Sequence, residues 1–102
     1  MQCDVHLNVD DASGQMPYLL DVQASLLSDL QTCVVVPLVR AESFVRPATR
    51  LHPRFTIAGH RLVVAIHLAA AVRRQALGTT VASLLDQRDI VISAIDVLWS
   101  GV

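Results

Sequence analysis

Polar and apolar residues alternate along the first stretch of the chain, residues 2–7 (QCDVHL), which predicts a half-buried strand. Two apolar runs, 18–24 (YLLDVQA) and 33–39 (CVVVPLV), also predict strands. The polar segment 10–17 (DDASGQMP) predicts a turn between the first two strands. Pro37 has no N–H for a ladder hydrogen bond, so we expect an edge or a bulge at this position.

The middle of the chain combines a loop with a candidate hairpin. Residues 46–54 (RPATRLHPR) contain two prolines and predict a loop. Residues 55–68 (FTIAGHRLVVAIHL) are a hairpin candidate with its turn at Gly59–His60. The next stretch, 69–78 (AAAVRRQALG), is ambiguous, because its composition favours a helix with the final glycine as C-cap.

A helix is predicted near the C-terminus by polar residues that recur at spacings of three and four: Asp86, Asp89, Ser93, Asp96 and Ser100. This spacing places them on one narrow stripe, and Asp86 is a candidate cap. The apolar arc that fills the remaining circumference is wider than one small sheet needs, so we expect part of it to face a second copy of the chain. Trp99 lies at the edge of this arc, beside Ile92 and Ile95.

The composition agrees with one small domain that gains stability by dimerising. The chain has 102 residues, of which 53% are hydrophobic, and its mean hydropathy is +0.50. No apolar run approaches the roughly 20 residues of a membrane span, and the first residues show no signal-peptide pattern. We therefore expect a cytoplasmic protein. Cys3 and Cys33 form no CxxC motif and are expected to be buried and reduced, in strands.

No catalytic motif emerges from the spacing of the reactive residues. The net charge is −1 and no basic stripe with interleaved aromatics is present, so direct nucleic-acid binding has little support. The four histidines show no metal-ligand spacing, and His6 and His67 are expected on an outward strand face, solvated or hydrogen-bonded. One enzymatic alternative stays open, in which a cluster converges to cleave RNA by general acid–base chemistry: His52, Arg54, His60 and Arg61. The residues alone otherwise support a small α+β interaction module.

Six segments resemble, in order and at matching intervals, the CcdB family of toxins from plasmid and chromosomal toxin–antitoxin pairs: MQCDVHL, LLDVQASLL, VVVPL, RLHP, ALGTTVASL and AIDVLWSGV. The most specific part is the combination of DVQ (21–23), VPL (36–38) and a tryptophan near the terminus. The resemblance runs nearly end to end, so residues 1–102 are expected to form a single domain. It implies an α+β fold, in which a twisted antiparallel SH3-like β-barrel or sheet carries a long C-terminal helix, and a homodimer. It also implies strand or loop over residues 69–78, because tertiary context can override helix propensity.

The resemblance implies a non-enzymatic toxin without a cofactor or metal. Such a toxin binds the A subunit of DNA gyrase, in the dimerisation region of its breakage–reunion domain, and traps the cleavage complex. A CcdA-like antitoxin neutralises it, and the pair represses its own operon through operator contacts made by the antitoxin. The sequence leaves topoisomerase IV open as the target. It also leaves open a relative that keeps the fold and the antitoxin but no longer poisons gyrase.

The resemblance places gyrase contacts in two parts of the chain. Leu26 and Leu27 correspond to the apolar pair that follows DVQ, although they are also plausible core residues. Asp96 corresponds to a polar helix residue before the terminus. The resemblance therefore implies gyrase contacts both from the segment that follows DVQ and from the C-terminal helix.

The C-terminal contacts include one departure from the family pattern. In a gap-free alignment Gly101 and Val102 keep the final two family positions, and Trp99 takes the aromatic position before the anchor. Ser100 then stands where the family has its critical tryptophan, and loss of a tryptophan hot spot typically costs more than about 2 kcal/mol of binding. Either Trp99 still reaches gyrase from a loosely wound last turn, or the chain binds this target weakly, differently or not at all. A third reading makes Trp99 an ordinary aromatic at the edge of the core.

Overall fold

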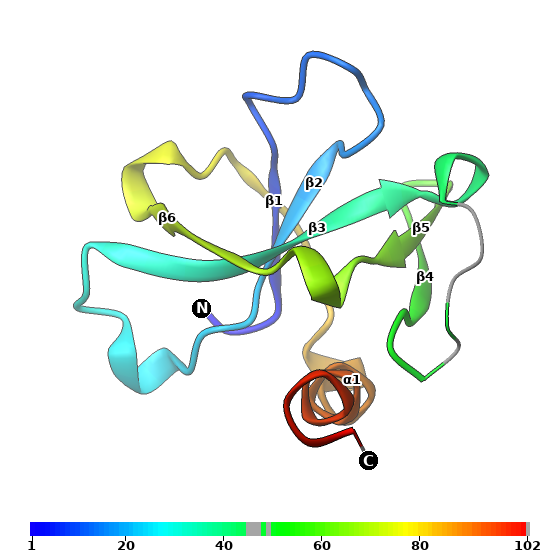
Figure 1. The fold of residues 1–102 in the computed structure, drawn as a ribbon. Coiled ribbons are helices and arrows are strands. Elements are labelled where there is room, and N and C mark those ends of the chain that lie inside the picture. Colours follow the sequence, from blue (N-terminus) through cyan, green and yellow to red (C-terminus); the bar gives the residue numbers. More distant parts are fainter. Residues whose placement is uncertain (45–47, 49, 102) are drawn as a thin grey trace.

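A curled antiparallel sheet with one α-helix packed beside it forms the molecule (Figure 1), which confirms the predicted α+β class. The computed structural model describes residues 1–44, 48 and 50–101. The strands are β1 (Asp4–Leu7), β2 (Tyr18–Asp21), β3 (Thr32–Arg40), β4 (Arg54–Ile57), β5 (His60–Val64), β6 (Ala70–Arg73) and β7 (Thr80–Ser83). The helix α1 (Arg88–Ser100) follows them. None of the helices in these ranges is long and apolar enough to cross a membrane.

The long strand β3 organises the sheet, whose order is β4-β5-β3-β2-β1-β7, with β6 paired to β3 outside this path. One edge of β3 pairs with β2, whereas the other pairs first with β6 and then with β5. Pro37 lies where this second edge changes partner, and its carbonyl accepts the Ala65 N–H at 3.0 Å. The expectation of an edge strand or a bulge is therefore wrong. A central strand tolerates this proline because its missing N–H faces the gap between two partners.

The predicted hairpin is present, with its turn one residue earlier than expected. β4 and β5 are joined by Ala58 and Gly59, whose φ angles of 51° and 80° suit the tight turn that matches the twist of a hairpin. The loop predicted over residues 46–54 is confirmed at 48 and 50–53 but wrong at Arg54, which begins β4, while 46, 47 and 49 lie outside the described residues. The prediction was wrong about the turn position because an alanine with positive φ is uncommon.

Residues 69–78 form strand β6 and a 3₁₀ turn, Arg74–Ala76, as the family resemblance implied. Pairing with residues 32–35 of β3 overrides the local helix preference. Gly78 is therefore not a helix C-cap. A Cβ at this position would lie 2.6 Å from the Leu7 carbonyl oxygen, and the Gly78 amide donates to that oxygen at 3.1 Å. Glycine is needed here because the backbone crosses close to the end of β1.

The helix α1 begins without a side-chain cap, because Gln87 occupies the N-cap position and Asp86 lies in the preceding 3₁₀ turn. The prediction of an Asp86 cap is therefore wrong. The predicted polar stripe is exposed to solvent along the whole helix. The helix ends at Gly101, whose left-handed φ of 76° lets its amide donate to the Val97 carbonyl at 2.9 Å.

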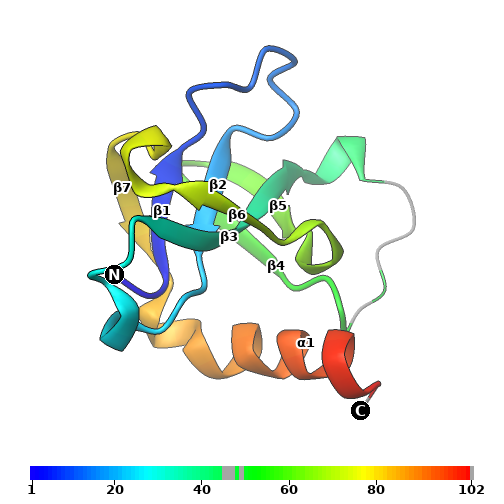
Figure 2. The ribbon, with the colours of Figure 1, turned by 60° about the vertical axis from the view of Figure 1, so that its left-hand side comes forward.

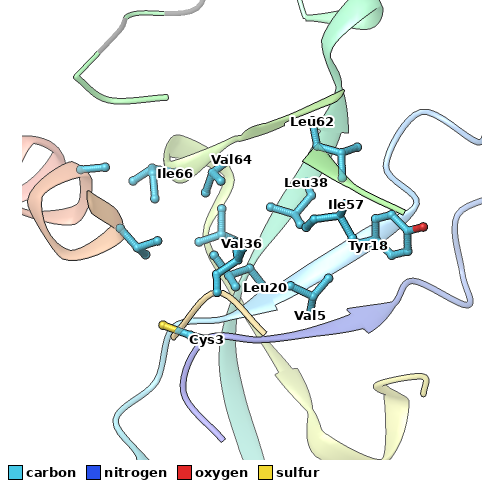
Figure 3. Close-up of a cluster of buried hydrophobic side chains, with 13 residues drawn as sticks. Cys3, Val5, Tyr18, Leu20, Val36, Leu38, Ile57, Leu62, Val64 and Ile66 are labelled. Carbon is cyan, nitrogen blue, oxygen red and sulfur yellow. The ribbon is translucent and has the colours of Figure 1, made fainter. Parts of the chain in front are cut away.

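The core lies between the concave face of the sheet and α1 (Figures 2 and 3). The sheet contributes fully buried side chains such as Leu20, Leu38 and Val64, and the helix contributes Val91 and Ala94. Cys3 and Cys33 are buried and unpaired, as expected, although Cys3 lies in the turn before β1. Burial raises the pKa of both thiols, that of Cys33 to about 11, so both are protonated at neutral pH.

Candidate functional site

An apolar groove of about 590 Å³ lies between the segment that follows β2 and the C-terminal half of α1. Leu27 and Val22 line its loop side, and Ile95, Leu98 and Trp99 line its helix side. Residues of β3 and β6 also line it. Figure 1 shows the 25–27 segment and the helix on the same side of the sheet. We call this feature the helix-end groove.

Trp99 is 78% exposed at the rim of the helix-end groove. It is therefore not an edge-of-core aromatic, and the last helical turn directs it away from the packed residues of the core. Its neighbour Leu98 is 41% exposed, so the end of the helix presents two large apolar side chains to solvent. Exposed apolar groups of this size at a groove are typical of protein interaction sites.

Ser100 faces solvent and makes a local hydrogen bond. Its hydroxyl donates to the Asp96 carbonyl oxygen at 2.8 Å, one helical turn back. Asp96 and Gly101 are also exposed, so these predicted contact residues lie at one accessible helix end. Val102 falls outside the described residues. The helical conformation extends to Ser100, so the last turn is regular rather than loosely wound.

Leu26 and Leu27 lie in the 3₁₀ turn η1 (Ser25–Leu27) and project from the sheet. Leu26 is 91% exposed and Leu27 is 44% exposed, so the alternative that both belong to the core is wrong. Burying a leucine side chain contributes about 1.5–3 kcal/mol. Because Leu26 is almost fully exposed, a partner that covers it can gain nearly all of this free energy. No residue of η1 is buried, so the whole turn lies outside the core.

Two side chains fix the loop that carries η1. The amide of Gln23 accepts the Val34 N–H at 3.1 Å and donates to the carbonyls of Leu27 and Thr32, each at 3.2 Å. The guanidinium of Arg74 donates to the Leu30 and Leu27 carbonyls at 2.7 and 3.3 Å. The apolar pair is thus presented on a loop held by five hydrogen bonds. A loop ordered before binding loses less conformational entropy when a partner arrives.

The four residues considered for RNA cleavage do not converge. Arg54 and Arg61 line one hollow, but His60 is adjacent to Arg61 in β5 and points to the opposite face of the strand, where it contacts the Arg40 guanidinium at 3.1 Å. His52 is buried and hydrogen-bonded elsewhere. The general acid–base cluster that the sequence left open is therefore not formed.

His52 and His67 form a directed hydrogen-bond pair. The Ala48 N–H donates to Nδ1 of His52 at 2.9 Å, so Nε2 of His52 carries the proton and donates to Nδ1 of His67, also at 2.9 Å. Burial, followed by the charge of His67, lowers the pKa of His52. Within the described ranges no group of three or more His, Cys, Asp or Glu side chains could hold a metal ion.

His6 lies apart from this pair, so the expected shared outward face of His6 and His67 is wrong. Nδ1 of His6 donates to the Gly78 carbonyl at 3.1 Å, and His67 lies in the 3₁₀ turn after β5 rather than in a strand. The expectation that both are hydrogen-bonded is confirmed. Neither contact could be predicted from spacing, because each joins segments that are distant in the sequence.

Comparison with protein families finds one match that covers nearly the whole chain. The family model described as CcdB protein matches residues 2–101. No curated protein matches the chain. The matched range includes both parts of the candidate site, the η1 loop and the end of α1.

Proposed function

Because the chain belongs to the CcdB family, whose members are toxins of toxin–antitoxin systems that act on gyrase, we propose that it binds the gyrase A subunit and traps the gyrase–DNA cleavage complex. In this proposal the chain is a protein inhibitor and not an enzyme, and it requires no cofactor. The proposed contact residues are Leu26, Leu27, Asp96, Trp99, Ser100, Gly101 and Val102.

The exposure of Trp99 is the observation that carries the proposal. Tryptophan is enriched among interface hot spots, and a side chain with 78% of its surface exposed is available to a partner. Leu27 and Trp99 line the same groove, so the two parts of the proposed contact surface are joined by one continuous apolar feature. This supports a protein target rather than a small-molecule ligand.

We further propose that the toxin is a homodimer. Ile90 and Leu98 are 48% and 41% exposed on the isolated chain, and the helix carries more apolar surface than the sheet covers. Association through the Ile90 part of the helix would bury apolar surface and leave the helix-end groove, which Leu98 lines, open to gyrase. Sedimentation equilibrium over a concentration series tests this state, and a monomer at every concentration would contradict it.

The remaining partners follow from the same family. We propose that a CcdA-like antitoxin neutralises the chain in the cytoplasm through a tail that folds on binding, and that operator DNA is contacted only through the antitoxin. Ordering such a tail costs free energy, which moderates affinity while permitting a large interface.

Ser100 favours a second candidate function. Its hydroxyl is bonded back to its own helix, so the position at which the family carries its anchor offers no large side chain to gyrase. The alternative is a CcdB-fold protein that binds the antitoxin and represses the operon but does not poison gyrase. Topoisomerase IV is the other target to compare.

Calorimetric titration into the gyrase A breakage–reunion domain, beside a plasmid cleavage assay with whole gyrase, distinguishes these functions. We expect binding and accumulation of linear DNA. Leu26→Ser should weaken both, whereas Leu85→Ser, at an exposed leucine before α1, is the matched control. A folded chain that neither binds nor causes cleavage would contradict the toxin proposal and favour the co-repressor. Binding to the corresponding topoisomerase IV domain alone would reassign the target.

A further inference from the structure

A second hollow lies on the outer face of the β4–β5 hairpin, distinct from the helix-end groove. In the antiparallel register Thr56 is opposite Arg61, and Arg54 is opposite Val63. Because side chains alternate between faces, all four residues share the face turned away from the core. The two arginines are diagonal neighbours on it, close enough for one ligand to reach both guanidinium groups.

The hollow is an open depression with walls on two sides. It has a volume of about 410 Å³, and Ala41, Glu42 and Phe44 form the wall opposite the hairpin. Val63 is only 1% exposed at its base. The Phe44 ring packs 4.8 Å from the His52 ring and 5.9 Å from the His67 ring, so this wall is supported from behind. An apolar base beneath two charged groups suits an amphipathic ligand.

Neither guanidinium group has a hydrogen-bond or ion-pair partner among the described residues. Arg40, Arg74 and Arg88 donate hydrogen bonds within the protein, whereas none is recorded for Arg54 or Arg61. The ion pairs found within the described part of the chain involve only the amino-terminal group. Two like charges close together on exposed strands are unfavourable by themselves, and an anion placed between them would remove that repulsion.

The charge distribution along the chain reinforces this local excess. Residues 30–85 contain seven arginines and a single acidic residue, Glu42, although the whole chain has a net charge of −1. The strands and loops around the hollow therefore belong to a positively charged segment, and the other eight acidic residues lie within residues 4–29 and 86–96. Such a segment attracts an acidic partner before contact is made.

We propose that this hollow binds a carboxylate-bearing peptide segment of a protein partner. A carboxylate accepts paired hydrogen bonds from arginine, and the hydroxyl of Thr56 adds a donor at the same face. An apolar side chain of the same peptide packs on the half-buried Phe44. The inference concerns a site outside the proposed gyrase contacts and does not depend on them.

Glu42 favours a peptide over a nucleic acid as the ligand. Nucleic-acid binding draws its affinity from several basic residues that neutralise successive phosphates, and here a carboxylate lines the same hollow as only two arginines. A peptide carries N–H donors beside its carboxylates, so it can satisfy Glu42 and both arginines together. A phosphate chain offers Glu42 only repulsion.

Titration followed by backbone amide NMR tests the site with defined probes. The probe is a short capped peptide of glutamate and leucine, and its control replaces every glutamate by glutamine. We expect shifts at the Thr56 and Arg61 amides with the acidic peptide alone. The double variant Arg54→Gln/Arg61→Gln should weaken its affinity by about tenfold or more, the scale of two charge-assisted contacts.

Arg73→Gln is the matched control, because Arg73 is an exposed arginine on β6 with the same charge and no recorded hydrogen bond. We expect it to change the affinity by less than about twofold, since a distant exposed charge is screened by salt. Equal weakening by Arg73→Gln would mean nonspecific attraction and would overturn the proposal. So would an absence of binding to the unaltered chain. Tighter binding of a short oligothymidylate, displaced from the same amides by the peptide, would assign the hollow to nucleic acid instead.

Discussion

Replacing Trp99 with alanine should affect partner binding far more than folding. The side chain is at the rim of the helix-end groove, and the helix ends two residues later at a glycine cap that does not depend on the indole. The substitution also keeps a good helix former in the last turn. The variant should therefore remain folded and lack only the exposed anchor.

The exposed fraction sets the expected size of the folding effect. With 78% of Trp99 exposed, about a fifth of a surface of about 250 Å² is covered, which is about 55 Å². At about 25 cal/mol per Å², this burial contributes about 1.4 kcal/mol to the free energy of unfolding. A hot-spot tryptophan contributes more than about 2 kcal/mol to binding, so the gyrase dissociation constant should rise by at least about thirtyfold.

Urea unfolding and calorimetric titration of the same preparation separate the two effects. A loss of more than about 3 kcal/mol in unfolding free energy would show that Trp99 belongs to the core and would refute the reasoning from exposure. An unchanged dissociation constant in a folded variant would refute its role as the anchor. The converse substitution, Ser100→Trp, should strengthen gyrase binding, because it places an indole where the family resemblance expects one and costs only the local bond to Asp96.

Three further substitutions probe the structure elsewhere. Gln23→Ala removes the acceptor of the Val34 N–H, so that amide should exchange faster with solvent and the unfolding free energy should fall by about 1–2 kcal/mol; unchanged exchange would contradict the role given to this side chain. The pKa of His52 is lowered by burial and by His67, so the unfolded chain binds more protons than the folded chain below about pH 6.5. Stability should therefore fall as the pH drops through that value. The His52→Gln variant should show urea midpoints that depend less on pH. An equally steep dependence in the variant would exclude His52 as the source. Gly78→Ala places a methyl group against the Leu7 carbonyl of β1 and should lower the free energy of unfolding in urea by about 1–3 kcal/mol. An unchanged free energy of unfolding would mean that the backbone at residue 78 can move away from β1 without cost.

The strands that alternation marked clearly could be predicted from sequence, and those defined by distant pairing could not. Polar and apolar residues alternate over residues 2–7, and residues 4–7 form β1, because one face of that strand packs on the core. The 69–78 stretch carries helix-forming residues and becomes β6 only because β3 supplies a partner. The position of Pro37 in a central strand likewise depends on where two other strands end.

The candidate site divides in the same way. The polar stripe predicted the solvent-exposed face of the helix, whereas the sequence left open whether Trp99 is exposed or part of the core. The register of β4 against β5 was not available from composition, so the sequence grouped Arg54 and Arg61 with two histidines that the fold directs elsewhere. Gln23 carried a signal in the DVQ motif, but its three hydrogen bonds depend on the path of the loop that it closes.

The position of Trp99 gives the unmodified chain its own optical reporter. It is the only tryptophan, and the only tyrosine, Tyr18, is buried in the core. Selective excitation therefore reads the environment of one helix end, and in the free chain the indole emits from a largely aqueous setting. A partner that covers the groove would move that emission to shorter wavelength, so occupancy of this surface is visible without a label or a substitution.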